Sequence, residues 1–150
     1  MKADSFCSII CDIQHAADLS DGQKKRLLLL VYYIKDTDIS LLKNIHPKRI
    51  SEITGDSEKE TIVDVLYFLC GHKWHLLESV YRYTSLYDKE PIELEEDELT
   101  EIREIGYIYI NNGRLRSVFD PSNLFITFTI SENAKKLKTI YALDYSKEML

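Results

Sequence analysis

Glycine and proline are scarce in this sequence, with five glycines and three prolines among 150 residues. Long flexible linkers are therefore not expected, and no internal repeat or low-complexity run is visible. Cysteine is scarce as well. Its three copies are an odd number, which suits reduced thiols better than a disulfide framework.

Long apolar runs are also missing. The longest, residues 27–34, covers eight positions, whereas a membrane-spanning helix needs roughly 20. Residues 1–17 contain Asp4, Asp12 and His15, which interrupt the continuous apolar centre that a secretory signal requires. Together with the cysteine count, these absences predict a cytoplasmic protein with no membrane partner.

One segment accounts for the negative charge of the chain, which is formally −6. Residues 88–104 hold nine acidic side chains against Lys89 and Arg103, a net −7, so the remaining residues carry +1. Nucleic-acid binders usually show the opposite, a basic face that neutralises phosphates. The hydrophobic content of 45 % and the length predict a single globular domain over 1–150.

Hydrophobic spacing predicts helices over the first 70 residues. An amphipathic helix is expected over 4–18 and a second over 21–35, which begins with a capping box of Ser20 and Gln23. Because the second helix is apolar on every side, we expect it in the core or in a subunit interface, so an oligomer is possible. Shorter helices are predicted over 38–45, 47–54 and 57–70.

The last two of these helices form a helix-turn-helix over 47–70. Pro47 suits the first helical turn and Gly55 the residue that ends a helix, while Ser57 and Glu60 form a capping box for the second helix. The expected buried stripe of this helix is Ile62, Val65, Leu66 and Leu69.

Beyond Gly71 the pattern favours strands. A strand is expected over 76–84, and a helix over 96–105 with Leu99, Ile102 and Ile105 inward. A hairpin follows over 107–119, because its centre, Asn111-Asn112-Gly113, has the composition of a tight turn. The remaining predicted elements are a turn over 120–123, a strand over 124–130 and a helix over 132–141 capped by Ser131.

This order of helices, helix-turn-helix and strands resembles the winged-helix superfamily over residues 38–130. The resemblance implies an α+β fold, in which N-terminal helices (1–36) pack on a winged-helix-like core (37–141) that carries a small antiparallel sheet. The acidic helix inserted between the first strand and the hairpin departs from the simplest version of that fold.

The resemblance also implies that helix 57–70 could enter the major groove of DNA. Its expected outward side chains include three carboxylates and one lysine, a poor surface for phosphates. The cations that could contact a DNA backbone are Lys43, Lys48, Arg49 and Lys73. A DNA-binding transcriptional regulator is therefore the alternative interpretation.

Cysteines and histidines provide weak candidates for a metal site. Zinc prefers four such ligands in a tetrahedron, but no Cys-x-x-Cys pair is present and the spacing fits no familiar zinc finger. Cysteine is also common as a small buried hydrophobe. We expect no bound metal and no cofactor at the candidate ligands Cys7, Cys11, His15, Cys70, His72 and His75.

No catalytic signature is present either: the nucleophile elbow, the phosphate-binding loop, the dinucleotide fingerprint and the zinc-protease motif are all missing. Ten tyrosines are a high count, and tyrosine is favoured in interfaces. We interpret the chain as a non-enzymatic protein-interaction module, an adaptor or subunit of a larger assembly with a basic partner. The expected contact residues are Glu95, Glu96, Glu98, Glu101, Tyr107 and Tyr109.

Overall fold

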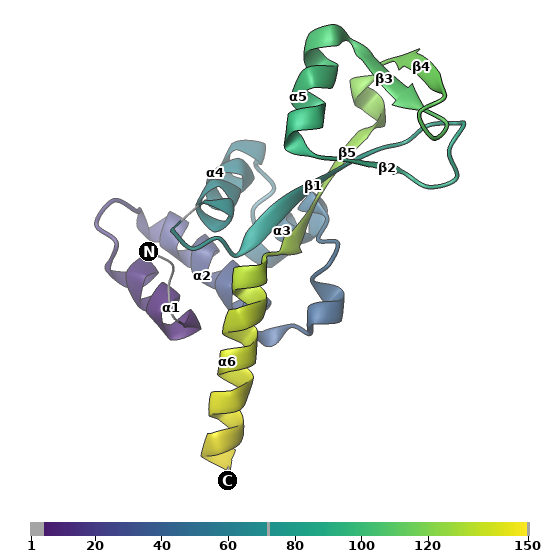
Figure 1. Cartoon of the computed structure of the whole chain (residues 1–150). Helices are drawn as coiled ribbons and strands as arrows, with labels where there is room; N and C mark the ends of the chain where they lie inside the picture. Colours follow the sequence, from purple (N-terminus) through teal and green to yellow (C-terminus); the bar gives the residue numbers. More distant parts are fainter. Residues whose placement is uncertain (1–4, 72, 150) are drawn as a thin grey trace. The chain divides into compact units, whose positions relative to one another are not determined.

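The computed structural model describes residues 5–71 and 73–149, with side chains described as far as residue 142 (Figure 1). Helices combine with a small antiparallel sheet, which confirms the predicted α+β class. The chain divides into two compact units, Met1–Glu78 with Phe128–Leu150 (the helical unit) and Ser79–Thr127 (the inserted unit). No helix in the described part of the chain is both long enough and apolar enough to cross a membrane.

The helical unit follows the predicted order of elements, but the helix expected over 38–45 is shorter and the one expected over 132–141 extends to Met149. Its elements are α1 (Phe6–His15), α2 (Asp21–Asp36), η1 (Ile39–Leu41), α3 (Pro47–Thr54), α4 (Lys59–Cys70) and α6 (Glu132–Met149). The helix expected over 38–45 is only the short 3₁₀ turn η1. It cannot continue because Ile45 is extended and exchanges two backbone hydrogen bonds with Phe128, at 2.7 and 2.9 Å.

Local signals account for most helix ends in this unit. The Ser20 hydroxyl accepts from the Gln23 N–H at 3.2 Å, and the Gln23 side chain accepts from the Ser20 N–H at 2.8 Å, so the first capping box is confirmed. Gly55 has a φ of 71°, the left-handed conformation expected where α3 ends. The second predicted capping box, Ser57 with Glu60, is wrong. The residue before α4 is Glu58, whose N–H is bound at 2.9 Å by the Asp56 side chain instead.

The core of the helical unit lies where α2 packs on α1, α3 and α4. Four side chains of α2 are buried (Leu27, Leu30, Val31 and Ile34), but Leu29 and Tyr32 are exposed. The prediction that α2 is buried all round is therefore only half right. On α4 the stripe of Ile62, Val65 and Leu69 is buried as predicted, whereas Leu66 is half-buried.

A lysine of α6 holds the C-terminal end of α2. The Lys138 ammonium donates to three carbonyl oxygens, those of Ile34 at 2.7 Å, Lys35 at 3.0 Å and Thr37 at 2.5 Å. Carbonyls at the end of a helix lack partners within the helix, so this contact satisfies groups that would otherwise need water. Burial lowers the pKa of Lys138, and the nearby Asp36 carboxylate opposes that shift.

The inserted unit combines sheets with one helix. Strands β1 (Leu77–Tyr83) and β5 (Leu124–Ile130) each begin in one unit and end in the other. The sheet has the order β2-β1-β5, with β2 (Ile92–Leu94) antiparallel to β1, and the hairpin of β3 and β4 is separate. The other elements are α5 (Glu96–Ile105), β3 (Tyr107–Ile110), β4 (Leu115–Val118) and the 3₁₀ turn η2 (Pro121–Asn123).

Five side chains form the core of this unit: Tyr83, Leu94, Leu99, Ile108 and Ile110. The sequence did not predict β2, because three residues within an acidic run give no alternating pattern. Ile105 also differs from its prediction, since its side chain is 54 % exposed at the last turn of α5. The helix ends there because Gly106 takes a left-handed φ of 82°.

Candidate binding hollow in the inserted unit

In the inserted unit, more large apolar side chains are exposed than are buried. Nine large apolar side chains of residues 79–127 are exposed to solvent, against five in the core. The exposed side chains are Leu86, Tyr87, Ile105, Tyr107, Tyr109, Leu115, Val118, Phe125 and Ile126.

Two of these side chains, Tyr87 and Tyr109, line an open hollow of about 700 Å³. One wall is formed by residues 87–91 of the loop that connects β1 to β2, together with Ile92 at the start of β2, and the other is the end of the β3–β4 hairpin. The complete lining is Tyr87, Asp88, Lys89, Glu90, Pro91, Ile92, Tyr109, Asn112 and Gly113. All of them belong to the inserted unit, so this unit alone builds the hollow.

Asp88 ties the two walls together. Its carboxylate accepts from the backbone N–H of Asn111 at 2.9 Å and from that of Asn112 at 3.3 Å. Both asparagines have left-handed φ values, 52° and 56°, and Gly113 follows at 79°, so the predicted hairpin turn is present. A carboxylate that binds two N–H groups of a turn fixes the turn against the loop. The hollow is therefore held open by the protein itself.

Alternation along β3 orients the tyrosines. Ile108 and Ile110 point into the core, so Tyr107 and Tyr109 lie on the opposite, exposed face of the hairpin. On this face the guanidinium of Arg116 lies 4.6 Å from the centre of the Tyr107 ring. Tyr109 is 60 % exposed and Tyr87 64 %, which leaves most of both rings accessible.

The acidic helix α5 packs on the other face of the hairpin. Its Leu99 belongs to the same core cluster as Ile108 and Ile110. The carboxylates predicted as contacts (Glu95, Glu96, Glu98 and Glu101) are all exposed, but the hairpin separates them from Tyr107 and Tyr109. The acidic residues that line the hollow together with Tyr87 and Tyr109 come from the start of the acidic segment, Asp88 and Glu90.

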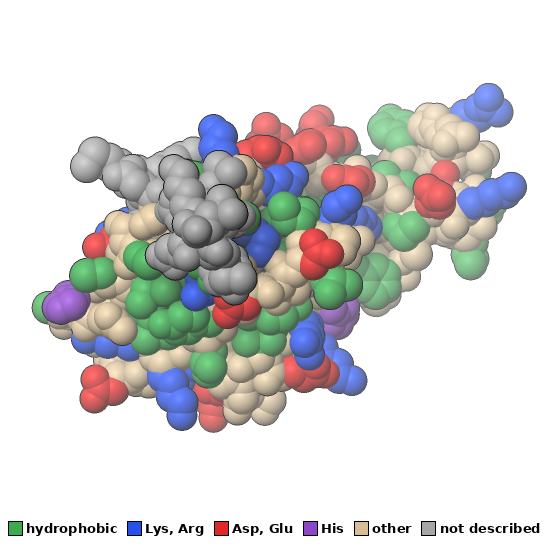
Figure 2. Space-filling model, turned by 90° about the horizontal axis from the view of Figure 1, so that it is seen from below, with side chains coloured by type: hydrophobic (Ala, Val, Ile, Leu, Met, Phe, Trp, Pro, Cys, Tyr) green, Lys and Arg blue, Asp and Glu red, His purple; other side chains and the backbone are tan. Residues whose placement is uncertain are grey.

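The cations proposed for DNA contact are exposed but partly engaged. Arg49 pairs with Glu52 at 3.1 Å and lies 5.4 Å from the centre of the Tyr33 ring. Lys73 lies over the Trp74 ring, 5.5 Å from its centre. Lys43 and Lys48 are exposed. In the face shown in Figure 2, Lys and Arg side chains lie scattered among Asp and Glu, without a uniformly basic patch.

The metal candidates that the structure describes do not form one site. Cys7 and Cys11 are exposed on α1, where the Cys11 sulfur lies 3.5 Å from Nδ1 of His15. Within residues 5–71 and 73–149 no three His, Cys, Asp or Glu side chains form a group that could hold a metal ion. His72 lies outside the described residues.

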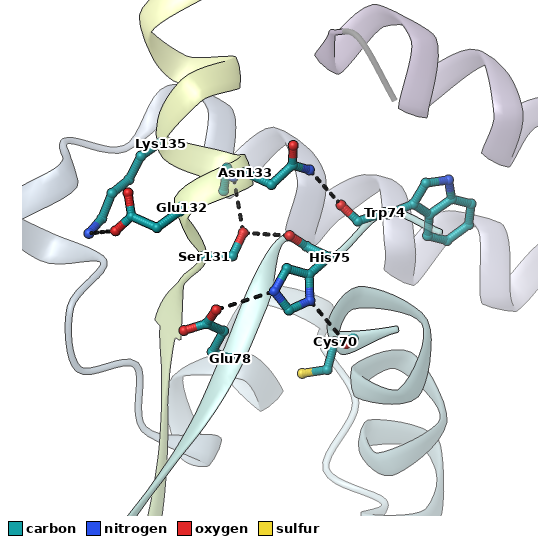
Figure 3. Close-up of polar contacts among 9 residues, drawn as sticks. Cys70, Trp74, His75, Glu78, Ser131, Glu132, Asn133 and Lys135 are labelled. Carbon is teal, nitrogen blue, oxygen red and sulfur yellow. Dashed lines mark hydrogen bonds and ion pairs between the residues drawn. The ribbon is translucent and has the colours of Figure 1, made fainter. Parts of the chain in front are cut away.

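Cys70 and His75 take part in a network of polar contacts around the segment that connects α4 to β1 (Figure 3). The His75 ring contacts the Cys70 carbonyl oxygen at 3.4 Å and the Glu78 carboxylate at 3.2 Å. From the start of α6, Ser131 donates to the His75 carbonyl and Asn133 to the Trp74 carbonyl, the latter at 2.9 Å. These contacts hold the chain between two elements, which is a structural role.

We therefore expect protein purified without chelators to contain no stoichiometric zinc, because no three of the described candidate ligands form a group that could hold the ion. Elemental analysis checks this directly. One zinc per chain, lost together with stability when Cys7 or Cys70 is replaced by serine, would contradict the assignment.

Sequence reasoning identified Tyr109 but not its neighbours Tyr87, Asp88 and Glu90 as a site. The sequence feature that could have pointed to this site is the position of Asp88, which is the first residue of the acidic segment. No protein-family model matches this chain, and neither a curated protein nor a solved structure matches it.

Proposed function

We propose that this chain is a non-enzymatic protein-interaction module, an adaptor or subunit of a larger assembly, that binds a partner through the inserted unit. The observation that carries the proposal is the hollow with two accessible tyrosine rings and walls fixed by Asp88. Tyrosine offers a large contact area for few rotatable bonds and is a frequent anchor of interfaces.

Charge supports a basic partner. The inserted unit holds ten acidic and five basic side chains, a net −5, and Asp88 and Glu90 lie at the hollow itself. Complementary charge speeds association and excludes acidic competitors. A cytoplasmic setting belongs to this proposal and is supported by the three free cysteines. The short helix α3, the turn at Gly55 and the longer α4 support the resemblance to winged-helix proteins.

The test is co-purification from the native host with quantified partner recovery. The double variant Tyr87→Ala/Tyr109→Ala should lower recovery of a specific partner at least about tenfold, since anchor residues of this kind contribute about 2 kcal/mol or more. Tyr67→Ala is the matched control, because Tyr67 is an exposed tyrosine of α4 in the other unit. Equal recovery with both variants, each with an unchanged circular dichroism spectrum, would contradict the proposal.

DNA binding is a second candidate function. The order of α3 and α4 favours it, but the charges on the exposed side of α4 disfavour it. The exposed side chains of α4 include Glu60, Val63 and Tyr67, with Lys59 as the cation. We expect binding to random duplex DNA at physiological salt to be no tighter than the usual non-specific range, about 10⁻⁴ to 10⁻⁶ M. Fluorescence anisotropy with labelled duplex measures it.

Any residual DNA affinity should depend on Lys43, Lys48, Arg49 and Lys73 and should fall steeply as salt rises, because each phosphate contact releases counterions. Submicromolar binding that Lys48→Glu with Arg49→Glu abolishes, and that charge reversal at Glu95, Glu96 and Glu98 leaves intact, would favour the transcriptional regulator over the adaptor.

A further inference from the structure

We infer that the hollow receives an arginine side chain presented by an extended segment of the partner. This inference rests on the proposed function and names the chemistry that the hollow recognises. Three features of the hollow carry it: two accessible aromatic faces, a local excess of negative charge, and an apolar part of the lining.

The aromatic rings of Tyr87 and Tyr109 suit a guanidinium. A guanidinium stacks on aromatic rings more effectively than an ammonium, and cations within about 6 Å of a ring centre are attracted by it. The hairpin already shows this contact, since Arg116 lies 4.6 Å from the centre of the Tyr107 ring. Among the described residues, lysine or arginine groups lie over the rings of Tyr32, Tyr33, Trp74, Tyr107 and Tyr141, but over neither Tyr87 nor Tyr109. The two rings of the hollow are thus free to take a cation from outside.

The charge at the hollow has the sign that a cation needs. Within the lining, Asp88 and Glu90 outnumber Lys89, and both acidic residues lie on the loop that faces Tyr109. Arg116 pairs with Tyr109 across the hairpin, but its guanidinium lies over the Tyr107 ring. The Asp88 carboxylate is occupied by two backbone N–H groups of the turn, while the exposed Glu90 carboxylate is available to pair with a guanidinium. Phosphates of a nucleic acid would meet the same carboxylates with repulsion.

The apolar part of the lining fits the rest of an arginine side chain. Pro91, at the end of this loop, and Ile92, the first residue of β2, follow the carboxylates in the lining. Long cationic side chains bury their methylene stems on apolar surface while the charged head reaches polar groups. The hollow is open, so a side chain can enter from an extended backbone that passes over it. Its size, about 700 Å³, also leaves room for residues that flank the arginine.

The experiment is a titration of the full chain with defined peptides. An unstructured Gly/Ser peptide with four arginines is compared with the same peptide carrying lysine, with the same peptide carrying glutamate, and with a single-stranded oligonucleotide. We expect saturable binding of the arginine peptide, at least about threefold weaker binding of the lysine peptide, and none of the glutamate peptide or the oligonucleotide, in line with the preference of aromatic rings for guanidinium.

Matched variants localise the binding. Glu90→Lys should lower the affinity for the arginine peptide at least about tenfold. Glu101→Lys makes the same change of charge at an exposed position of α5 and should lower the affinity less than about twofold at 0.15 M salt. Salt screens the interaction between the peptide and charges that lie away from the site. Tyr109→Phe keeps the ring and should preserve binding, while Tyr109→Ala should not.

Three outcomes would overturn the inference: equal weakening by Glu90→Lys and Glu101→Lys, equal binding of the arginine and glutamate peptides, or binding of the oligonucleotide that Tyr109→Ala abolishes. The co-purification test separates the two proposals. If the arginine peptide fails while recovery of the native partner still depends on Tyr87 and Tyr109, the inference is wrong and the interaction module stands. If neither depends on the tyrosines, both are wrong.

Discussion

Replacing Leu69 by alanine is expected to lower the free energy of unfolding of the helical unit by about 2–5 kcal/mol. The Leu69 side chain is completely buried, at 0 % exposure, on the face of α4 that belongs to the main core. Its carbonyl oxygen also accepts from the N–H of Leu76 at 2.8 Å, which fixes the backbone around the cavity that the substitution leaves. A backbone held in this way cannot relax to fill the space. Urea denaturation followed by far-UV circular dichroism measures the effect.

Val63 provides the matched control, because it is an aliphatic residue of the same helix with 57 % of its side chain exposed. Val63→Ala should change the free energy of unfolding by no more than about 0.5 kcal/mol. Leu66→Ala should fall between the two, since Leu66 is half-buried. Similar shifts of the denaturation midpoint for Leu69→Ala and Val63→Ala would show that the buried face of α4 has been assigned wrongly.

The behaviour of α4 illustrates how far the sequence leads. A helical period of 3.6 residues puts Ile62, Val65 and Leu69 on one side, and this side is buried. Periodicity does not give the width of the contact, so Leu66 at the edge of the stripe was expected to be buried and is only half so. The end of α3 at Gly55 could be predicted for a local reason, since a helix that ends in the left-handed conformation favours glycine.

Contacts between distant segments explain what the sequence did not reveal. The segment 38–45 has a helical pattern, yet Ile45 is extended because it pairs with Phe128, which lies 83 positions later. Competition from sheet pairing of this kind has no local signature.

The candidate site shows the same limit. Asp88 reaches Asn111 and Asn112 across more than 20 positions, so the hollow cannot be seen in any short window. The acidic helix and the tyrosine strand are neighbours in the sequence, which suggested one contact surface. The alternation of β3 instead places Tyr107 and Tyr109 on the face away from α5.

Replacing Tyr83 by alanine is expected to cost the inserted unit about 3–5 kcal/mol, the range for loss of a buried aromatic side chain. Tyr83 is one of only five side chains in that core, and its ring stacks on Phe119 at 5.3 Å between centres. Its hydroxyl oxygen also accepts from the backbone N–H of Asp120 at 3.1 Å. A core this small has little stability in reserve, so the loss should unfold residues 79–127 locally. Hydrogen exchange resolved by peptide should show faster exchange of the β3–β4 hairpin and of residues 87–92.

The helical unit has its own core and should keep its protection against exchange in this variant. The conservative variant Tyr83→Phe retains the stacked ring and loses only the hydrogen bond, so it should cost about 0.5–1.5 kcal/mol and leave exchange of the hairpin slow. Because the hollow requires both the loop and the hairpin, Tyr83→Ala should abolish binding of the arginine peptide and Tyr83→Phe should preserve it. Equal protection of the hairpin in Tyr83→Ala and Tyr83→Phe would mean that other contacts hold the inserted unit together. Faster exchange throughout α1 to α4 in Tyr83→Ala would mean that the two units unfold as one.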